Sequence, residues 1–370
     1  MITFRWFGPR DPVLLSQIRQ IPAVRGIVGS LFDIPVGDVW PLDRVEKLRE
    51  EIERNGMSLE VIESIPVHED IKLGRPTRDR LIDKYCESVR NIGRAGVPVL
   101  CYNFMPVFDW MRTDLALRLG DGSTALAFDE SALSAIDLSR GTADLPGWAT
   151  AYTREQLARL LDAYRSVNEE QLWINLSYFL ERVIPVAADS GVKMALHPDD
   201  PPWSIFGLPR IITSGAALER VTSLVDDPAN GITFCAGSLA ADPANDLRAI
   251  ADCLASRGRI HFVHCRNIER TGFHAFRETA HPSDNGDVDM RAVLAALHDS
   301  GFEGPIRPDH GRMIWGETGQ PGYGLYDRAL GAMYLHGLWE GVAGASVARR
   351  PGSPTSGRIS GPSALKNSKR

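Results

Sequence analysis

The stretch Gly304-Pro305-Ile306-Arg307-Pro308-Asp309-His310-Gly311-Arg312 places an acid, an imidazole and a guanidinium directly after a short apolar segment. A buried parallel strand is expected to be apolar and to end at a turn. Polar side chains at its carboxyl end therefore lie on the face where α/β folds carry out their chemistry. Asp-His-Gly also suits an ordinary turn, so this stretch by itself is compatible with either interpretation.

Three earlier apolar segments end in the same way, which favours the functional interpretation. The expected strands at 193–196, 232–234, 260–263 and 305–307 are followed by His197, Cys235, His264 and Asp309, respectively. A single histidine or cysteine is more often a buried core residue than a ligand, and we assign His261 such a structural role. Four in succession are different, because neighbouring strand ends of a barrel meet at one mouth.

The four side chains form a plausible ligand set for one metal ion. Two imidazoles, a thiolate and a carboxylate suit a divalent transition metal such as Mn, Fe, Co or Zn. The thiolate of Cys235 disfavours Mg²⁺ and Ca²⁺, which prefer oxygen ligands. The sequence therefore predicts a transition-metal site at the carboxyl ends of the last four strands.

Short apolar runs alternate with longer segments of helical period along almost the whole chain, which is typical of a parallel sheet with helical crossovers. The first four strands are expected at 3–7, 24–28, 58–62 and 97–102. Helices are expected at 12–20, 41–55, 77–95, 169–190, 216–225, 245–256, 289–300 and 326–339. Eight strands alternating with eight helices predict an α/β fold, a (β/α)8 TIM barrel, over residues 1–343.

Two segments depart from this alternation. Residues 109–153 mix helix-like and loop-like pieces and are interpreted as an insertion after strand four, which acts either as a lid over the active face or as a peripheral element. Residues 344–370 are rich in Ser, Gly, Pro, Lys and Arg with almost nothing to bury, which predicts a disordered tail.

Composition excludes several classes of function. A net charge of −6 over 370 residues argues against general binding to nucleic acid or anionic membranes. The chain has no apolar run of about 18 residues that could span a bilayer, and its start lacks the regions of a signal peptide. Five cysteines without a CxxC motif suit a reducing compartment. We therefore expect a soluble, cytoplasmic protein.

Several of these segments resemble the signature segments of the mannonate dehydratase family. They are His197-Pro198-Asp199-Asp200-Pro201-Pro202, Phe234-Cys235-Ala236-Gly237-Ser238, His261-Phe262-Val263-His264-Cys265-Arg266-Asn267 and Arg307-Pro308-Asp309-His310-Gly311-Arg312. The opening Phe4-Arg5-Trp6-Phe7-Gly8 and the late Gly322-Tyr323-Gly324-Leu325-Tyr326-Asp327-Arg328-Ala329-Leu330-Gly331 are similar as well. The resemblance covers about residues 1 to 342 and leaves the C-terminal tail outside it.

The resemblance implies a xylose-isomerase-like TIM barrel that dehydrates D-mannonate to 2-keto-3-deoxy-D-gluconate in glucuronate breakdown. It implies Mn²⁺ or Fe²⁺ held at the four positions named above, and an acid/base pair matching His310 and Tyr323. Tyr326, three residues on, is an alternative to Tyr323, and the resemblance leaves open which member of the pair is the base.

The chemistry of such a dehydration agrees with these residue types. A base removes the C2 proton beside the carboxylate, an acid protonates the departing C3 hydroxyl, and a metal acts as Lewis acid. Arginines match the geometry of a carboxylate. The candidates for substrate binding are Arg5, Arg266 and Arg312 for the carboxylate, and Asn103 and His274 (or His281) for sugar hydroxyls; Trp110 and Trp203 could form walls.

Two other functions compete with this one. The first is a metal-dependent sugar isomerase or epimerase of the same superfamily, which would favour carboxylate ligands over the thiolate of Cys235. The second is a catalytically silent barrel that binds a sugar acid, which would be expected to have lost a ligand or the His310 and Tyr323 pair. For either enzyme the partner is a small sugar acid or sugar, and a homo-oligomer, most commonly a dimer, is expected.

Overall fold

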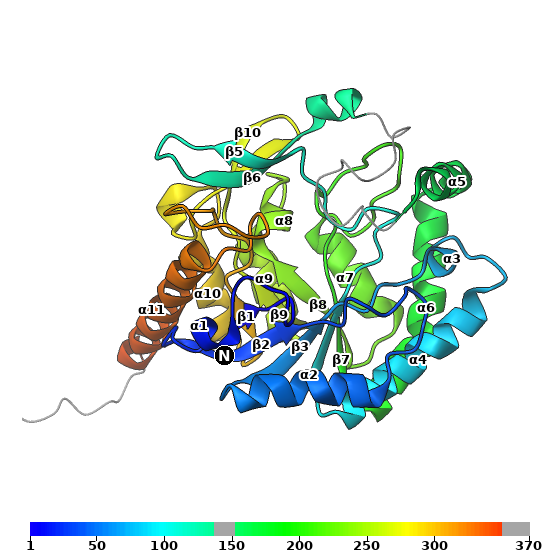
Figure 1. The fold of residues 1–370 in the computed structure, drawn as a ribbon, viewed down its shortest axis with the longest axis horizontal. Helices are drawn as coiled ribbons and strands as arrows, with labels where there is room; N and C mark the ends of the chain where they lie inside the picture. The colour runs from blue at the N-terminus through cyan, green and yellow to red at the C-terminus, as the bar shows by residue number, and fades with distance from the viewer. Residues whose placement is uncertain (137–151, 350–370) are drawn as a thin grey trace, which may run out of the picture.

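A closed barrel of eight parallel strands forms the centre of the molecule (Figure 1). The computed structural model describes residues 1–136 and 152–349. The strands follow one another around the barrel in the order β1-β12-β9-β8-β7-β4-β3-β2. Their bounds are β1 Ile2–Arg5, β2 Val24–Gly29, β3 Ser58–Glu63, β4 Val99–Tyr102, β7 Lys193–Leu196, β8 Asn230–Cys235, β9 Ile260–His264 and β12 Ile306–Arg307. The predicted TIM barrel is confirmed.

Alternation along the strands separates two apolar cores. Successive side chains of a strand point to opposite faces of the sheet. Ile27 and Leu100 accordingly belong to the large core between the barrel and its helices, whereas their neighbours Val28 and Cys101 belong to a separate cluster. That cluster fills the inside of the barrel and consists of Val28, Val61, Val99, Cys101, Ala195 and Phe262. The barrel is therefore packed below its mouth.

Helices surround the barrel, as Figure 1 shows. Their bounds are α1 Leu15–Ile18, α2 Leu42–Arg54, α3 Glu69–Lys72, α4 Arg78–Arg94, α5 Arg154–Tyr164, α6 Glu169–Asp189, α7 Gly215–Leu224, α8 Ala236–Ala240, α9 Leu247–Ser256, α10 Met290–Asp299 and α11 Tyr326–Arg349. Several begin at a side chain that accepts a backbone N–H of the first turn, as Asn168, Ser214, Asp246 and Asp289 do. The helix expected at 12–20 is confined to the single turn of α1.

A second, antiparallel sheet lies beyond the carboxyl ends of the barrel strands (Figure 1). Its order is β10-β11-β6-β5, with bounds β5 Asp114–Arg118, β6 Thr124–Asp129, β10 Ile268–Gly272 and β11 Ala275–Glu278. The strands β5 and β6 belong to the segment that follows β4, and β10 and β11 follow β9. Short 3₁₀ turns, η1 Glu130–Ala135 and η4 Ser283–Asn285, adjoin this sheet. We call it the accessory sheet.

The accessory sheet corrects the interpretation of residues 109–153. The first part of that segment is a β-hairpin paired with β11, where Phe128 lies opposite Phe276, and its last described residues lead into α5. Residues 137–151 lie outside the described residues. Whether the segment acts as a lid stays a prediction.

The carboxyl end of the barrel domain also differs from the expectation. Helix α11 continues to Arg349, past residue 343, where the sequence placed the end of the domain, and residues 350–370 of the expected tail lie outside the described residues. Over residues 1–136 and 152–349, none of the helices combines the length and apolar character needed to cross a bilayer.

Candidate active site

The carboxyl ends of β7, β8 and β9 bring His197, Cys235 and His264 together. One ligand atom from each lies within 4.8 Å of the others. The register accounts for this, since Cys235 is directly opposite His264 in the parallel pairing of β8 with β9. The closest approach is between Nε2 of His197 and Nδ1 of His264, at 3.1 Å.

The fourth predicted ligand, Asp309, lies just after β12 and borders this group. Its Oδ2 is 3.9 Å from Sγ of Cys235 and 3.8 Å from Nδ1 of His264. Burial works against ionisation of this carboxyl, but neighbouring His310 and Arg307 hold the pKa of Asp309 well below its usual value. Asp309 therefore carries a negative charge toward the cluster.

Contacts behind the cluster fix how the ligand atoms are presented. Nδ1 of His197 is 2.6 Å from the carbonyl oxygen of Pro198, which can only accept, so that nitrogen carries a ring proton and Nε2 is the nitrogen turned toward the cluster. The hydroxyl of Ser238 is 3.1 Å from Sγ of Cys235. The outer nitrogen of His264, Nε2, faces Oε1 of Glu63 at 3.5 Å.

His310 and Tyr323 form a buried pair next to the cluster. Nε2 of His310 is 2.8 Å from the Tyr323 hydroxyl, and the two rings meet edge to face. The indole of Trp110 lies against His310 with ring centroids 5.1 Å apart. Tyr326, the alternative to Tyr323, is 42% exposed, and its ring contacts that of Trp315 at a tilt of 45°. Tyr323 is thus the tyrosine that is hydrogen-bonded to His310.

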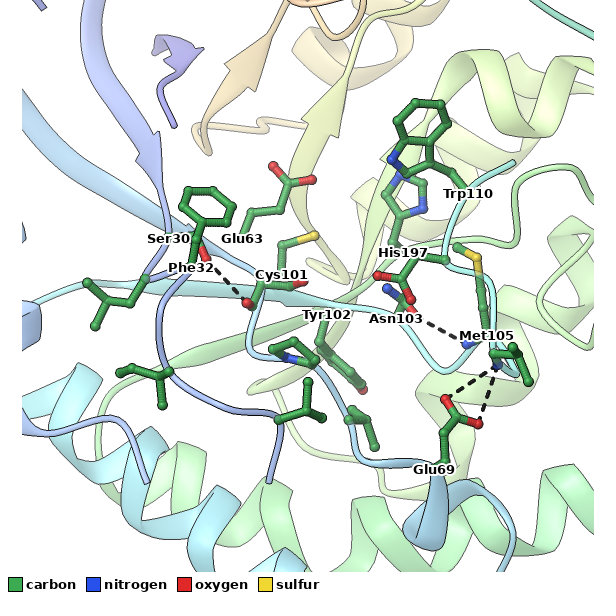
Figure 2. Close-up of a pocket in the computed structure, with 18 of the residues that line it drawn as sticks. Ser30, Phe32, Glu63, Glu69, Cys101, Tyr102, Asn103, Met105, Trp110 and His197 are labelled. Carbon is green, nitrogen blue, oxygen red and sulfur yellow. Dashed lines mark hydrogen bonds between the residues drawn. The ribbon is translucent and has the colours of Figure 1, made fainter. Parts of the chain in front are cut away.

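A cavity of about 280 Å³ adjoins the cluster. His197, Trp110 and Tyr323 line it on the side of the cluster. Figure 2 shows Glu63 and Cys101 on one side of His197 and Trp110 on the other, with Glu69 near Met105. The remaining wall is largely apolar and includes Leu31, Phe32, Ile34, Val36, Val67 and Val107. A pocket with an apolar wall and a few convergent polar groups is typical of a small-molecule site.

Comparisons with known proteins agree on one family. The family model for D-mannonate dehydratase (UxuA) matches residues 1–349. The chain belongs to this family. It is 56% identical over 342 residues to mannonate dehydratase 2 of Halalkalibacterium halodurans, covering 92% of this chain and 99% of that protein. It is also 56% identical over 352 residues to the mannonate dehydratase of Thermotoga neapolitana, covering 92% and 98%.

Solved structures lead to the same family and the same fold. The crystal structure of mannonate dehydratase from Streptococcus suis serotype 2 matches with a TM-score of 0.87 and 50% identity, covering 93% of this chain and 95% of that chain. A xylose isomerase domain protein from Planctomyces limnophilus matches with a TM-score of 0.53 at 14% identity over 93% and 98%. The second likeness concerns the barrel alone.

Within this mannonate dehydratase fold, only some of the five residues predicted to bind substrate lie at the cavity. Arg5 and Asn103 line the cavity. Arg266 lies behind the cluster, with Nη1 3.4 Å from Oδ2 of Asp309 and 3.3 Å from Nδ1 of His310. Arg312 is paired with Asp121 and Asp327, and His274 with Glu130 and the ring of Trp203, so neither of them takes part in lining this cavity.

The sequence interpretation missed a buried group of charges behind His310. Arg112 donates to both carboxylate oxygens of Asp200 at 2.8 and 3.0 Å and to Oε1 of Glu278 at 2.7 Å. Arg266 donates to Asp200 at 2.6 Å. These four side chains are at most 1% exposed. Asp200 belongs to the motif His197-Pro198-Asp199-Asp200-Pro201-Pro202, in which only His197 was predicted to act. Glu278 follows Phe276 at a spacing of two in β11, a signal that could have placed both on the buried face.

Proposed function

We propose that this protein removes water from D-mannonate to give 2-keto-3-deoxy-D-gluconate, a step of hexuronate catabolism. The observation that carries the proposal is the clustering of His197, Cys235, His264 and Asp309 beside the hydrogen-bonded pair His310 and Tyr323, next to a cavity that His197 and Tyr323 line. Membership of the D-mannonate dehydratase family supports the substrate.

The residues present fit a divalent transition metal, for which we propose Mn²⁺ or Fe²⁺. The ion would be held by Nε2 of His197, Sγ of Cys235, Nδ1 of His264 and Oδ2 of Asp309. The orientation of His197, with Nε2 toward the cluster, and the charge on Asp309 support this set. Such an ion supplies a Lewis acid for negative charge that develops on the substrate carboxylate when C2 loses its proton.

The His310 and Tyr323 pair supplies the two proton transfers. Burial raises the pKa of Tyr323, an effect only partly opposed by nearby Arg307, so its hydroxyl stays protonated and is suited to donate to the departing C3 hydroxyl. His310, whose Nε2 lies 2.8 Å from that hydroxyl, is then the group that accepts the C2 proton. The enol that results from loss of water tautomerises to the 2-keto acid.

Two cavity residues are proposed to hold the substrate. Arg5, at the end of β1, presents a guanidinium to the cavity and fits the carboxylate. Asn103, directly after β4, fits a sugar hydroxyl through its amide nitrogen, because its Oδ1 already accepts from the N–H of Met105 at 3.1 Å.

The decisive experiment is an assay of the purified protein on D-mannonate with Mn²⁺ or Fe²⁺ and with EDTA, following the 2-keto-3-deoxy acid. Metal-dependent product is expected, and His310→Asn is expected to keep the metal and lose turnover. Stoichiometric metal binding without product under any condition would overturn the proposal in favour of a sugar isomerase or epimerase. A cytoplasmic homo-oligomer stays a prediction, for which sedimentation of the purified protein measures the assembly.

A further inference from the structure

Glu278 contacts the imidazole of His310 directly. Its Oε1 is 2.8 Å from Nδ1 of His310, and its Oε2 is 3.1 Å from the same nitrogen. The other ring nitrogen, Nε2, is the one bonded to the Tyr323 hydroxyl. Glu278, His310 and Tyr323 therefore form a continuous chain of hydrogen bonds that ends at the cavity, which Tyr323 lines.

The direction of these bonds follows from the chemistry of the carboxylate. Burial disfavours its charge, but the pKa of Glu278 lies below its usual value, and the guanidinium groups of Arg112 and Arg266 stabilise the carboxylate. An ionised carboxylate can only accept, so Nδ1 of His310 must carry a proton. Nη1 of Arg266 is 3.3 Å from the same nitrogen, but it cannot donate to a nitrogen that carries a proton. The shorter contact, from Nδ1 to Glu278 at 2.8 Å, therefore fixes where the proton lies. In the neutral ring Nε2 is then unprotonated.

We propose that Glu278 is a positioning residue of the dehydration, which fixes His310 in the tautomer and orientation whose Nε2 is ready to accept a proton. This inference rests on the proposed function. It is related to the general arrangement in which a buried carboxylate orients a catalytic imidazole, with a tyrosine as the partner of the imidazole here.

The accessory sheet places Glu278. In β11, Phe276 and Glu278 share one face and are each 1% exposed, whereas Arg277 between them pairs with Glu269. Phe276 stacks on Phe128 of β6 at a centroid distance of 5.9 Å. The insertion after β4 therefore acts on the site by holding β11, and with it the carboxylate, against the barrel mouth.

A purely structural alternative is that Glu278 only neutralises Arg112 and Arg266, because a buried charge must be paired. Asp200 offers a matched comparison, because it pairs with the same two arginines. Among the described residues, Asp200 makes neither a hydrogen bond nor an ion pair with His310. Replacing either acid by its amide removes one negative charge from the same group of charges, but only Glu278→Gln disturbs the acceptor of Nδ1.

The test compares Glu278→Gln with Asp200→Asn in the metal-loaded protein, each with its metal content and melting temperature measured. Glu278→Gln is expected to lower kcat for D-mannonate by about a hundredfold or more, with KM within about threefold. The kinetic isotope effect with 2-deuterated D-mannonate is expected to rise, because proton removal becomes slower. Asp200→Asn is expected to show a smaller loss of kcat per bound metal and an unchanged isotope effect.

A double variant isolates the route of action. In a His310→Asn background, adding Glu278→Gln is expected to leave the small residual rate of His310→Asn unchanged, because the residue acts through His310. Equal losses of kcat for Glu278→Gln and Asp200→Asn with no change in isotope effect, or additive losses in the double variant, would overturn the proposal. Should Glu278→Gln not fold, Glu278→Asp keeps the charge but withdraws the carboxylate by one carbon–carbon bond, about 1.5 Å, and is expected to show the same kinetic pattern.

Failure of the proposed function is distinguishable from failure of this inference. The wild-type protein runs in every assay, and absence of product from wild type would count against D-mannonate as substrate. Product from wild type together with a Glu278→Gln variant of nearly full kcat would leave the function standing and remove only the role of Glu278.

Discussion

Replacing Tyr323 by phenylalanine removes one hydroxyl from the site and changes little else. The ring is buried, and it meets Phe7 edge to face with centroids 4.7 Å apart, a contact that phenylalanine retains. The hydroxyl makes the 2.8 Å bond to Nε2 of His310. If this hydroxyl is the general acid, its loss is expected to lower kcat by about 10² to 10⁴-fold, about 3 to 5 kcal/mol in the barrier, with KM within about threefold.

The expected effect on stability is smaller than the effect on the barrier. The variant leaves a buried imidazole nitrogen without its donor, which costs about 1 to 3 kcal/mol. For about 350 residues that corresponds to a fall of about 1 to 4 °C in the melting temperature. Metal content is expected to stay at the wild-type value, because Tyr323 is not among the proposed ligands.

Steady-state assays with D-mannonate, metal analysis and thermal unfolding of the same preparation measure these three quantities. The matched control is Tyr326→Phe, at an exposed tyrosine whose ring contacts Trp315. This variant is expected to keep kcat within about twofold. A Tyr323→Phe protein with full metal and kcat within tenfold of wild type would refute the role of this hydroxyl. A larger loss in Tyr326→Phe than in Tyr323→Phe would show that the wrong tyrosine was chosen.

Three further outcomes are expected. Cys235→Ser is expected to lower metal content and activity together, measured by metal analysis after dialysis, and full metal occupancy would contradict its assignment as a ligand. Burial lowers the folded-state pKa of His261 to about 4, below an unfolded value of about 6.5, so the unfolded chain binds the proton first as pH falls. Stability is then lost between about pH 6.5 and 4, by up to about 3 kcal/mol. Denaturant titrations should show a shallower dependence of the unfolding free energy on pH in His261→Gln, and equal slopes would contradict the role of His261 in this pH dependence. Phe179→Ala, at a fully buried ring packed against Tyr85 and Tyr102, is expected to cost about 3 to 5 kcal/mol of unfolding free energy with metal binding retained, and a loss below 1 kcal/mol would contradict the packing.

The order of the barrel elements could be predicted from the sequence because it depends on local patterns. Each strand is a short apolar run and each helix a longer amphipathic one, so strands such as Lys193–Leu196 were predicted at the bounds that the structure shows. The ends of the runs also showed which side chains emerge at the mouth. His197, Cys235, His264 and Asp309 follow from that rule, because parallel strands of one barrel share a carboxyl face.

The tertiary structure alone decided how the side chains around that mouth are partnered. Arg112 and Glu278 are 166 residues apart and meet only because the hairpin after β4 pairs with the hairpin after β9. No local pattern specifies such a pairing, since strand partners are chosen by long-range packing of their faces. For the same reason Arg312 and His274, which the sequence offered for substrate, are found paired with Asp327 and Glu130. The residue types and their strand positions could thus be predicted from the sequence. The hydrogen bonds between His310 and Glu278 depend on the accessory sheet, because its strand β11 carries Glu278.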